Sequence, residues 1–222
     1  MLVENYIDHE IPVLKTSDTI RTAIKKMEEA NLEQLPVIDQ DIFQGILLRT
    51  TAENVFDNKL KLEGIQLETL NTKITPATHI LEALKSASDA HLDVLGIVGN
   101  DQNKYAGSVK KSGLLDYFTQ MHGIKAVGSI ITISIPERDY SVNEIARIVE
   151  ANGAKILAIF TDIRQDDPFN ILVTLKINLT DLSRVISALQ RHNFTIVYTF
   201  HQEEFQSAEK DRLDHLLRFL SI

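Results

Sequence analysis

An internal repeat constrains the fold of this chain more strongly than any other feature of its sequence. Eight apolar residues of one segment recur as apolar residues sixty positions later. The first set is Ile20, Ala23, Ile24, Ala30, Leu32, Leu35, Val37 and Ile38, and the second is Ile80, Ala83, Leu84, Ala90, Leu92, Leu95, Ile97 and Val98. At an offset of sixty-two, Gly45 matches Gly107 and Phe56 matches Phe118. Two copies are fewer than the roughly three that a solenoid needs, so we expect them to fold against each other with clefts between them.

The residue pattern of each copy predicts a strand, a helix, two further strands and a second helix. In the first copy, Pro12 favours an extended start, and Thr16-Ser17-Asp18 offers an N-cap to a helix with apolar residues at helical spacing. Asn31 is expected to end that helix. Two strands should follow around a polar turn at residues 39–41, and a helix capped by Thr50 or Thr51 should reach residue 56. Residues 1–10 are interpreted as a lead-in and residues 57–73 as a polar connector.

Two strand motifs give the repeat a family resemblance. The first copy has Leu35-Pro36-Val37-Ile38-Asp39 followed by Gly45-Ile46-Leu47, and the second has Leu95-Gly96-Ile97-Val98 followed by Gly107-Ser108-Val109. This pattern resembles a tandem pair of CBS domains over roughly residues 1–120. The resemblance implies copies packed through their sheets, with two equivalent clefts that bind an adenine nucleotide such as AMP or ATP. The matched glycine would allow close backbone approach.

The chain departs from the CBS motif in both copies. The family usually has a Thr or Ser three residues after the glycine and an Asp six residues after it. Here those places hold Leu48 and Thr51 in the first copy and Lys110 and Gly113 in the second. A dimerisation core with degenerate clefts is therefore the alternative to nucleotide binding. The nucleotide-binding candidates are Thr16, Leu35, Pro36, Thr50, Thr51, Thr75, Lys110, Lys111 and Ser112.

After a glycine-containing linker at residues 121–128, the pattern changes to β-α-β-β-α-β over residues 129–200. Ser141 and Glu144 form a capping box at the first helix of this segment, and Asn152-Gly153 suits the end of that helix. The order predicts a ferredoxin-like α+β layout. It resembles an ACT domain, a small amino-acid-sensing module, especially in residues 145–149 and 152–154.

The loop before that first helix holds the candidate amino-acid site. The ACT resemblance implies a ligand between paired subunits, where the family commonly has Pro-Gly, but Val142 and Asn143 occupy those places. The amino-acid-binding candidates are Arg138, Asp139, Tyr140, Ser141 and Asn143. A solvated loop with a helix cap is the alternative. Backbone N–H groups at a helix start favour an anion such as a carboxylate.

Composition excludes several classes of function. With 23 Lys and Arg against 31 Asp and Glu, the net charge is −8, and neither half has a basic stripe for a nucleic acid. There is no cysteine, no signal-peptide pattern and no apolar run near the roughly 18 residues of a membrane span. No Walker loop, GxSxG or HExxH motif is present. We therefore expect a soluble cytoplasmic protein that is not an enzyme and holds no metal.

The tail, residues 202–222, predicts one helix with Leu213, Leu216, Leu217 and Leu220 on one face. That face can pack on its own domain or across a dimer. The domains expected are 1–122, with copies at about 11–57 and 73–120, and 123–222. This order is similar to the acetoin-utilisation family of CBS–ACT proteins. The resemblance implies a bacterial, homodimeric, ligand-sensing regulatory protein, and a homodimerisation or interaction module is the alternative.

Overall fold

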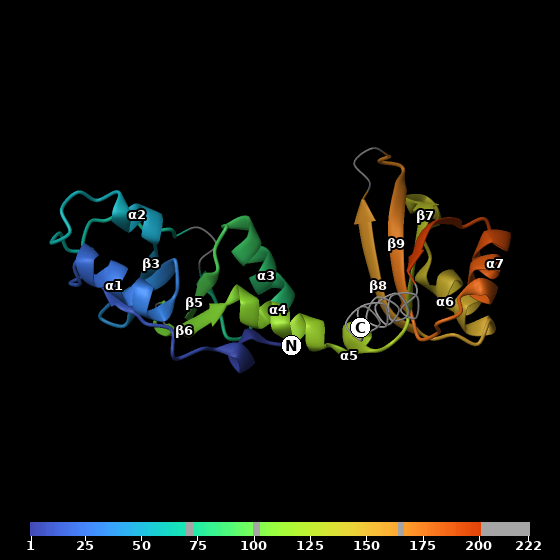
Figure 1. The fold of residues 1–222 in the computed structure, drawn as a ribbon, viewed down its shortest axis with the longest axis horizontal. Helices are drawn as coiled ribbons and strands as arrows, with labels where there is room; N and C mark the ends of the chain where they lie inside the picture. The colour runs from blue at the N-terminus through green and yellow to red at the C-terminus, as the bar shows by residue number, and fades with distance from the viewer. Residues whose placement is uncertain (70–72, 100–102, 164–166, 201–222) are drawn as a thin grey trace, which may run out of the picture. The chain divides into compact units, whose positions relative to one another are not determined.

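The computed structural model describes residues 1–69, 73–99, 103–163 and 167–200. The chain divides into two compact units, Met1–Phe118 and Thr119–Ile222, and each is considered by itself (Figure 1). None of the described helices is long and apolar enough to cross a membrane. The predicted tail helix lies outside the described residues.

The first copy in the first unit is a three-stranded sheet with two helices. The sheet has the order β1 (Leu14–Lys15), β2 (Gln34–Asp39) and β3 (Ile42–Leu48), with β1 parallel and β3 antiparallel to β2. Helix α1 spans Ile20–Ala30 and ends at Asn31, whose left-handed φ of 51° confirms the predicted stop. A short 3₁₀ turn, η1 (Val3–Tyr6), precedes the copy.

Both helix starts in this copy differ from the prediction. Thr19, not residues 16–18, caps α1, because its hydroxyl accepts a hydrogen bond from the N–H of Thr22. Helix α2 is Arg49–Glu53, begins after Leu48 without a side-chain cap, and ends before Phe56. Thr50 and Thr51 lie inside α2, so neither caps it.

The second copy repeats this layout. Strands β4 (Lys73–Ile74), β5 (Val94–Val98) and β6 (Tyr105–Lys110) form a sheet with the same parallel and antiparallel pairings, accompanied by α3 (Ile80–Asp89) and α4 (Lys111–Gln120). The cores of the copies are shared: Phe43 and Ile46 pack into the second copy's core, and Val94 packs into the first. The prediction that the copies fold against each other is therefore correct.

The second unit has the predicted β-α-β-β-α-β order. After α5 (His122–Lys125), a short helix within the predicted linker, come β7 (Ser129–Pro136), α6 (Val142–Ala151), β8 (Ile156–Ile163), β9 (Asn170–Ile177), α7 (Ser183–Arg191) and β10 (Thr195–Phe200). The antiparallel sheet has the order β10-β7-β9-β8. This is the ferredoxin-like layout, so the predicted mixed α/β and α+β fold class is confirmed.

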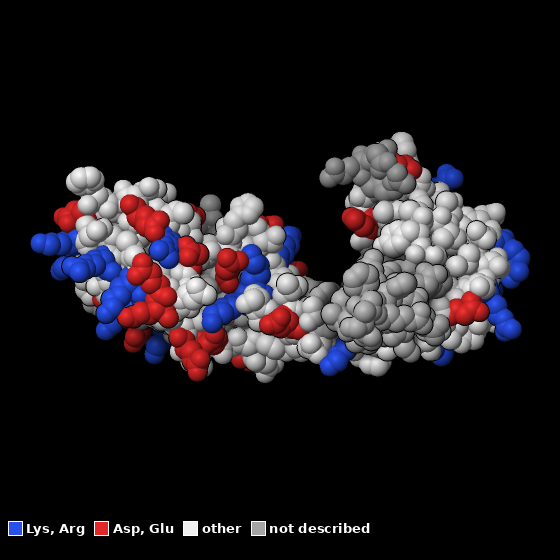
Figure 2. All heavy atoms as spheres, viewed as in Figure 1, with Lys and Arg blue, Asp and Glu red and all other residues white. Residues whose placement is uncertain are grey.

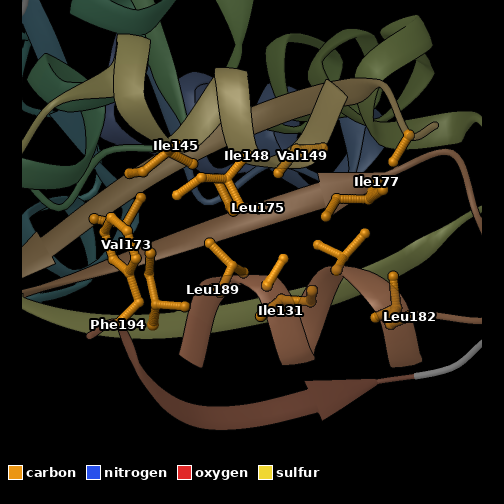
Figure 3. Packing of buried hydrophobic residues seen from close by; sticks show 14 of the residues in the cluster. Ile131, Ile145, Ile148, Val149, Val173, Leu175, Ile177, Leu182, Leu189 and Phe194 are labelled. Atoms are coloured by element: carbon orange, nitrogen blue, oxygen red, sulfur yellow. The ribbon is translucent and has the colours of Figure 1, made fainter. Parts of the chain in front are cut away.

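Periodicity explains the core of the second unit. Residues at alternate positions of β7 and β9, such as Ile131 and Leu175, are buried with the apolar faces of α6 and α7 (Figure 3). The Ser141 hydroxyl accepts from the N–H of Glu144 at 3.3 Å, which confirms Ser141 as the N-cap of α6. Gly153, with a φ of 77°, follows the helix end, where a left-handed residue is favoured.

Candidate functional site

The two repeats meet through a symmetric set of backbone and ring contacts. The N–H of Phe43 donates to the carbonyl of Asn103 at 3.1 Å, and the N–H of Tyr105 donates to the carbonyl of Asp41 at 2.8 Å. The pairs Asp41/Asn103 and Phe43/Tyr105 are both sixty-two positions apart. The Phe43 and Tyr105 rings also stack, with centroids 6.2 Å apart and planes at 10°. The sequence repeat is thus a local two-fold arrangement.

A buried amide adds one contact that breaks this symmetry. The Oε1 atom of Gln34, a residue only 6% exposed, accepts hydrogen bonds from the N–H groups of Asp93 at 3.0 Å and Val94 at 3.4 Å. The residue sixty positions after Gln34 is Val94, which has no side-chain acceptor to return the bond. Buried N–H groups are costly without a partner, so Gln34 helps to fix how the copies dock.

Each matched glycine lies where a second segment joins the strand edge. Beside Gly45, Ile46 and Glu68 exchange two backbone hydrogen bonds of 2.9 Å. Beside Gly107, the N–H of Asp8 donates to the carbonyl of Ser108 at 2.8 Å. Residues 7–9 and 67–69 are sixty positions apart, so they belong to the repeat. The predicted lead-in and connector therefore each add a bridge to a distant strand of the repeat.

The glycines are required by this close approach. A Cβ on Gly45 would lie 2.8 Å from the carbonyl oxygen of Glu68, and a Cβ on Gly107 would collide with the side chain of Ile7. Their φ angles of 156° and 142° are also unfavourable for other residues. The predicted reason for glycine at these positions is therefore confirmed.

Two hollows in the first unit meet at Thr16, and we call them together the Thr16 hollow. The larger, of about 370 Å³, is lined by Thr16, Gln44, Leu62, Glu63, Gly64, Ile65, Leu67 and Thr69. The smaller, of about 180 Å³, is lined by Lys15, Thr16, Ser17, Ile38, Asp39, Gln40 and Asp41. The Thr16 hydroxyl donates to the Asp39 carboxylate at 3.0 Å.

Strand order explains why Thr16 and Asp39 meet. Strands β1 and β2 are parallel and in register, with Lys15 opposite Ile38, so the residues after them come together. Polar residues that follow adjacent parallel strands often line ligand sites. The parallel pairing of β1 with β2 therefore identifies Asp39, which was not among the candidates predicted from the sequence. Gln44, which lies on β3, was also omitted, and so were Glu63 and Thr69, which only the folded connector brings to Thr16.

The other nucleotide-binding candidates lie apart from this hollow. Leu35 and Pro36 are buried in β2, so their side chains belong to the core. Thr75 forms hydrogen bonds with Thr78, and Thr50 is exposed on α2, where Thr51 is partly buried. Ser112 is exposed in α4.

The two candidate lysines are held by carboxylates. Lys110 lies 3.2 Å from Asp8, and Lys111 lies 2.6 Å from Asp93. Burial raises the pKa of Asp8, but the N–H of Glu10 and the Lys110 ammonium lower it more, so that the pKa lies below its usual value. Burial also raises the pKa of Tyr105, whose hydroxyl is 2.8 Å from the Ser108 hydroxyl. A phosphate at these lysines would have to compete with two carboxylates.

In the second unit, two hollows of about 470 Å³ each flank the segment between β7 and α6. One is lined by Pro136, Glu137, Arg138, Pro168, Phe169 and Asn170. The other is lined by Glu137, Tyr140, Thr161, Asp162, Ile163 and Ile171. Both hollows therefore include Glu137, which begins the 3₁₀ turn η2 (Glu137–Asp139).

Only two of the five amino-acid-binding candidates line these hollows, Arg138 in one and Tyr140 in the other. Asp139 lies 3.6 Å from the Arg138 guanidinium, Ser141 caps α6, and Asn143 is exposed within α6. Sequence reasoning missed the contributions of the β8–β9 hairpin. Their signal is in the sheet register, because Pro136 lies opposite Asn170 and only the pairing of β7 with β9 shows it.

Charge and metal chemistry add two observations. On the face shown in Figure 2, acidic and basic side chains are interspersed over the first unit. Within the described ranges, no group of three or more His, Asp or Glu side chains is placed to hold a metal ion.

The repeat is similar to CBS domains in known proteins. The CBS domain family model matches residues 3–52. A CBS domain pair/ACT domain protein from Thermotoga maritima is similar at a TM-score of 0.50 and 16% identity, covering 54% of this chain and 98% of that one. The CBS domains of a transcriptional regulator from Streptococcus pneumoniae are similar at a TM-score of 0.48 and 16% identity, covering 52% of this chain and 98% of that one. The structure of CBSX2 in complex with AMP is similar at a TM-score of 0.48 and 16% identity, covering 54% of this chain and 96% of that one.

The likeness to the Thermotoga maritima protein concerns the fold alone, because the identity is 16%. The CBS resemblance predicted from the strand motifs is confirmed, whereas the ACT and acetoin-utilisation resemblances stay predictions. Over about half of its length, this chain has the fold of a CBS domain pair.

Proposed function

We propose that this chain is a homodimeric, ligand-sensing regulatory protein without catalytic activity of its own. Its CBS pair binds an adenine nucleotide, AMP or ATP, and its second unit binds an amino acid. The observation that carries the proposal is the Thr16 hollow, where the ends of β1 and β2 meet the connector of the repeat. Its larger part, at about 370 Å³, falls within the range of roughly 300–1,000 Å³ for small-molecule pockets.

The lining of the Thr16 hollow suits a nucleoside. Leu62, Ile65 and Leu67 offer apolar contact to a base. The carboxylates of Asp39 and Glu63 accept hydrogen bonds, which is what ribose hydroxyls and an adenine amine donate. These carboxylates would supply the acidic ribose contact that the CBS motif lacks in this chain.

The phosphate group of a nucleotide bound in the Thr16 hollow would have one nearby cation. Among the residues that line its two parts, Lys15 is the only Lys or Arg, and its side chain is exposed. The acidic residues outnumber it, so the hollow favours a monophosphate over a triphosphate, whose charge is larger. We therefore propose AMP as the preferred ligand.

A thermal-shift titration tests this proposal. AMP at millimolar concentration should raise the melting temperature, because a ligand that binds only the native state stabilises it. Thr16→Val and Glu63→Gln should each reduce the shift, and Ser112→Ala, on α4, serves as the matched control. Equal shifts in all three variants would reject the Thr16 hollow as the site.

The candidate lysines distinguish the two clefts. If a nucleotide instead binds beside Gly107, replacing both Lys110 and Lys111 by Ala should weaken binding in a salt-dependent way. Binding at the Thr16 hollow leaves the affinity of that double variant unchanged. Calorimetry at two salt concentrations separates these results.

The alternative function is homodimerisation with degenerate clefts. The ion pairs of Lys110 with Asp8 and of Lys111 with Asp93 favour it for the second cleft, because they neutralise the cations that a phosphate would need. This alternative predicts a dimer in sedimentation and no thermal shift with AMP, ATP or adenosine. A 25 kDa monomer at micromolar concentration would count against dimerisation in both proposals.

For the second unit, the hollows beside Glu137 support amino-acid binding. Arg138 offers a cation to a carboxylate, while Glu137 and Asp162 offer anions to an ammonium group. In a screen of amino acids, Arg138→Ala should abolish the thermal shift. Arg147→Ala, at an exposed position of α6, should leave it unchanged. Absence of any shift in the wild type would leave this loop as a helix cap.

A further inference from the structure

The lead-in serves the second copy as the connector serves the first. In the first copy, the N–H of Glu63 donates to the carbonyl of Thr16 at 3.0 Å. In the second copy, the N–H of Glu4 donates to the carbonyl of Pro76 at 3.1 Å. Thr16 and Pro76 are sixty positions apart, so the same bond marks the same place in both copies. We call the place where the lead-in meets Pro76, just after β4, the Pro76 region.

Most of the polar lining of the Thr16 hollow is lost in the Pro76 region. Five polar residues of the hollow are Lys15, Thr16, Ser17, Asp39 and Gln44. Their counterparts, sixty positions later or, for the last, sixty-two, are Thr75, Pro76, Ala77, Gly99 and Ala106. A cation, two hydroxyls, a carboxylate and an amide are thus replaced by one hydroxyl and four side chains without polar atoms. The Thr16–Asp39 hydrogen bond of 3.0 Å has no equivalent, because neither proline nor glycine has a side-chain donor or acceptor.

The polar groups that remain in the Pro76 region offer less to a nucleoside. The Thr75 hydroxyl already bonds the Thr78 hydroxyl at 3.1 Å. In the lead-in, Glu4 stands for Glu63 and His9 for Thr69, and both lead-in residues are exposed. The counterpart of Gln40 lies outside the described residues. Among the described residues, the Pro76 region therefore lacks the cation and the Asp39 carboxylate of the hollow.

The second copy uses other side chains to hold the lead-in. The lead-in runs beside β6 and α4 (Figure 1), where a carboxylate oxygen of Asp8 lies 3.2 Å from the Lys110 ammonium. The counterpart of Lys110 in the first copy is Leu48, which carries no charge. The rings of Tyr6 and Tyr117 also meet, with centroids 4.7 Å apart. These side chains of the second copy therefore bind the chain itself.

We propose that the two copies have different roles and that the CBS pair binds one nucleotide per chain. The Thr16 hollow is the nucleotide site, whereas the Pro76 region holds the lead-in and binds none. The residues that distinguish the two places are Thr16, Asp39 and Gln44. This inference rests on the function proposed above. A nucleoside whose polar groups are paired in the hollow would leave them unpaired in the Pro76 region, and such a loss discriminates strongly between sites.

Calorimetric titration of AMP into the full chain tests this inference, because it measures both the affinity and the number of sites. The wild type should bind one AMP per chain. Thr16→Val should weaken that binding at least about tenfold. Pro76→Ala, at the counterpart position, is the matched control and should leave the affinity and the single site unchanged. Where Thr16→Val does not fold, Glu63→Gln replaces it.

Three results would overturn the inference, and they separate it from the proposed function. A second AMP per chain, with one retained in Thr16→Val, overturns the inference and leaves nucleotide sensing standing. A single site that Pro76→Ala weakens and Thr16→Val does not also overturns it, because the nucleotide then binds in the second copy. Absence of heat with AMP, ATP and adenosine at millimolar concentration overturns the proposed function and this inference together.

Discussion

Replacing Gly45 by Ala tests how tightly residues 67–69 join the first repeat. The new Cβ would lie 2.8 Å from the Glu68 oxygen and 2.9 Å from the Leu67 Cβ, whereas carbon contacts are comfortable near roughly 3.5 Å. Relief of this clash separates two backbone hydrogen bonds of 2.9 Å, each with a net contribution of about 0.5–1.5 kcal/mol. The φ of 156° adds strain of about 1 kcal/mol for a residue other than glycine.

Together these effects predict a loss of about 2–4 kcal/mol in the free energy of unfolding, measured by urea denaturation. Gly113→Ala is the matched control, because Gly113 lies inside α4 and a Cβ added there would have no atom within 4 Å. That substitution should stabilise the protein by about 0.5–1 kcal/mol. A change below about 0.5 kcal/mol for Gly45→Ala would refute the reasoning, since surface substitutions produce changes of that size.

Two further predictions concern the packing and the charge of the first unit. Phe43→Ala should cost about 3–5 kcal/mol because the side chain is 2% exposed, and a double-mutant cycle with Tyr105→Ala should give a coupling of about 0.5–1.5 kcal/mol. Additive effects would show that the rings do not interact. For Asp18, burial raises the pKa, but the Lys15 N–H and the Lys26 ammonium lower it overall. Its stabilisation is therefore present above about pH 3.9 and lost as pH falls through the lower folded pKa. The difference in the free energy of unfolding between the wild type and Asp18→Asn should therefore shrink as the pH falls from about 5 to about 2. A difference that stays constant over this range would contradict a lowered pKa for Asp18.

The elements with strong local signals were predictable from the sequence. Asn31 and Ser141 were identified because a left-handed stop and an N-cap each depend on one residue and its immediate neighbours. Thr19 was missed as a cap because several hydroxyl and carboxyl side chains precede α1, and only the geometry decides among them.

The candidate site was less predictable because it depends on non-local pairing. Residues 7–9 and 67–69 each make a single bridge to a distant strand, which leaves no periodicity to detect. Thr16 was identified, but its partner Asp39 required the register of β1 with β2. In the second unit, Glu137 and Asn170 line one hollow only because β7 pairs with β9.

Calorimetric titration of AMP into the wild-type protein and its Thr16→Val variant tests the proposed function most directly. The proposal predicts saturable binding to the wild type and at least about tenfold weaker binding to the variant. The variant lacks the Thr16 hydroxyl, and a hydrogen bond from that hydroxyl to the charged phosphate of AMP would contribute about 1.5–3 kcal/mol. Without ligand, the variant's melting temperature should fall only slightly, because the Thr16–Asp39 hydrogen bond that it loses is exposed to solvent. No detectable heat and no thermal shift with AMP, ATP or adenosine at millimolar concentration would contradict the proposed nucleotide sensing.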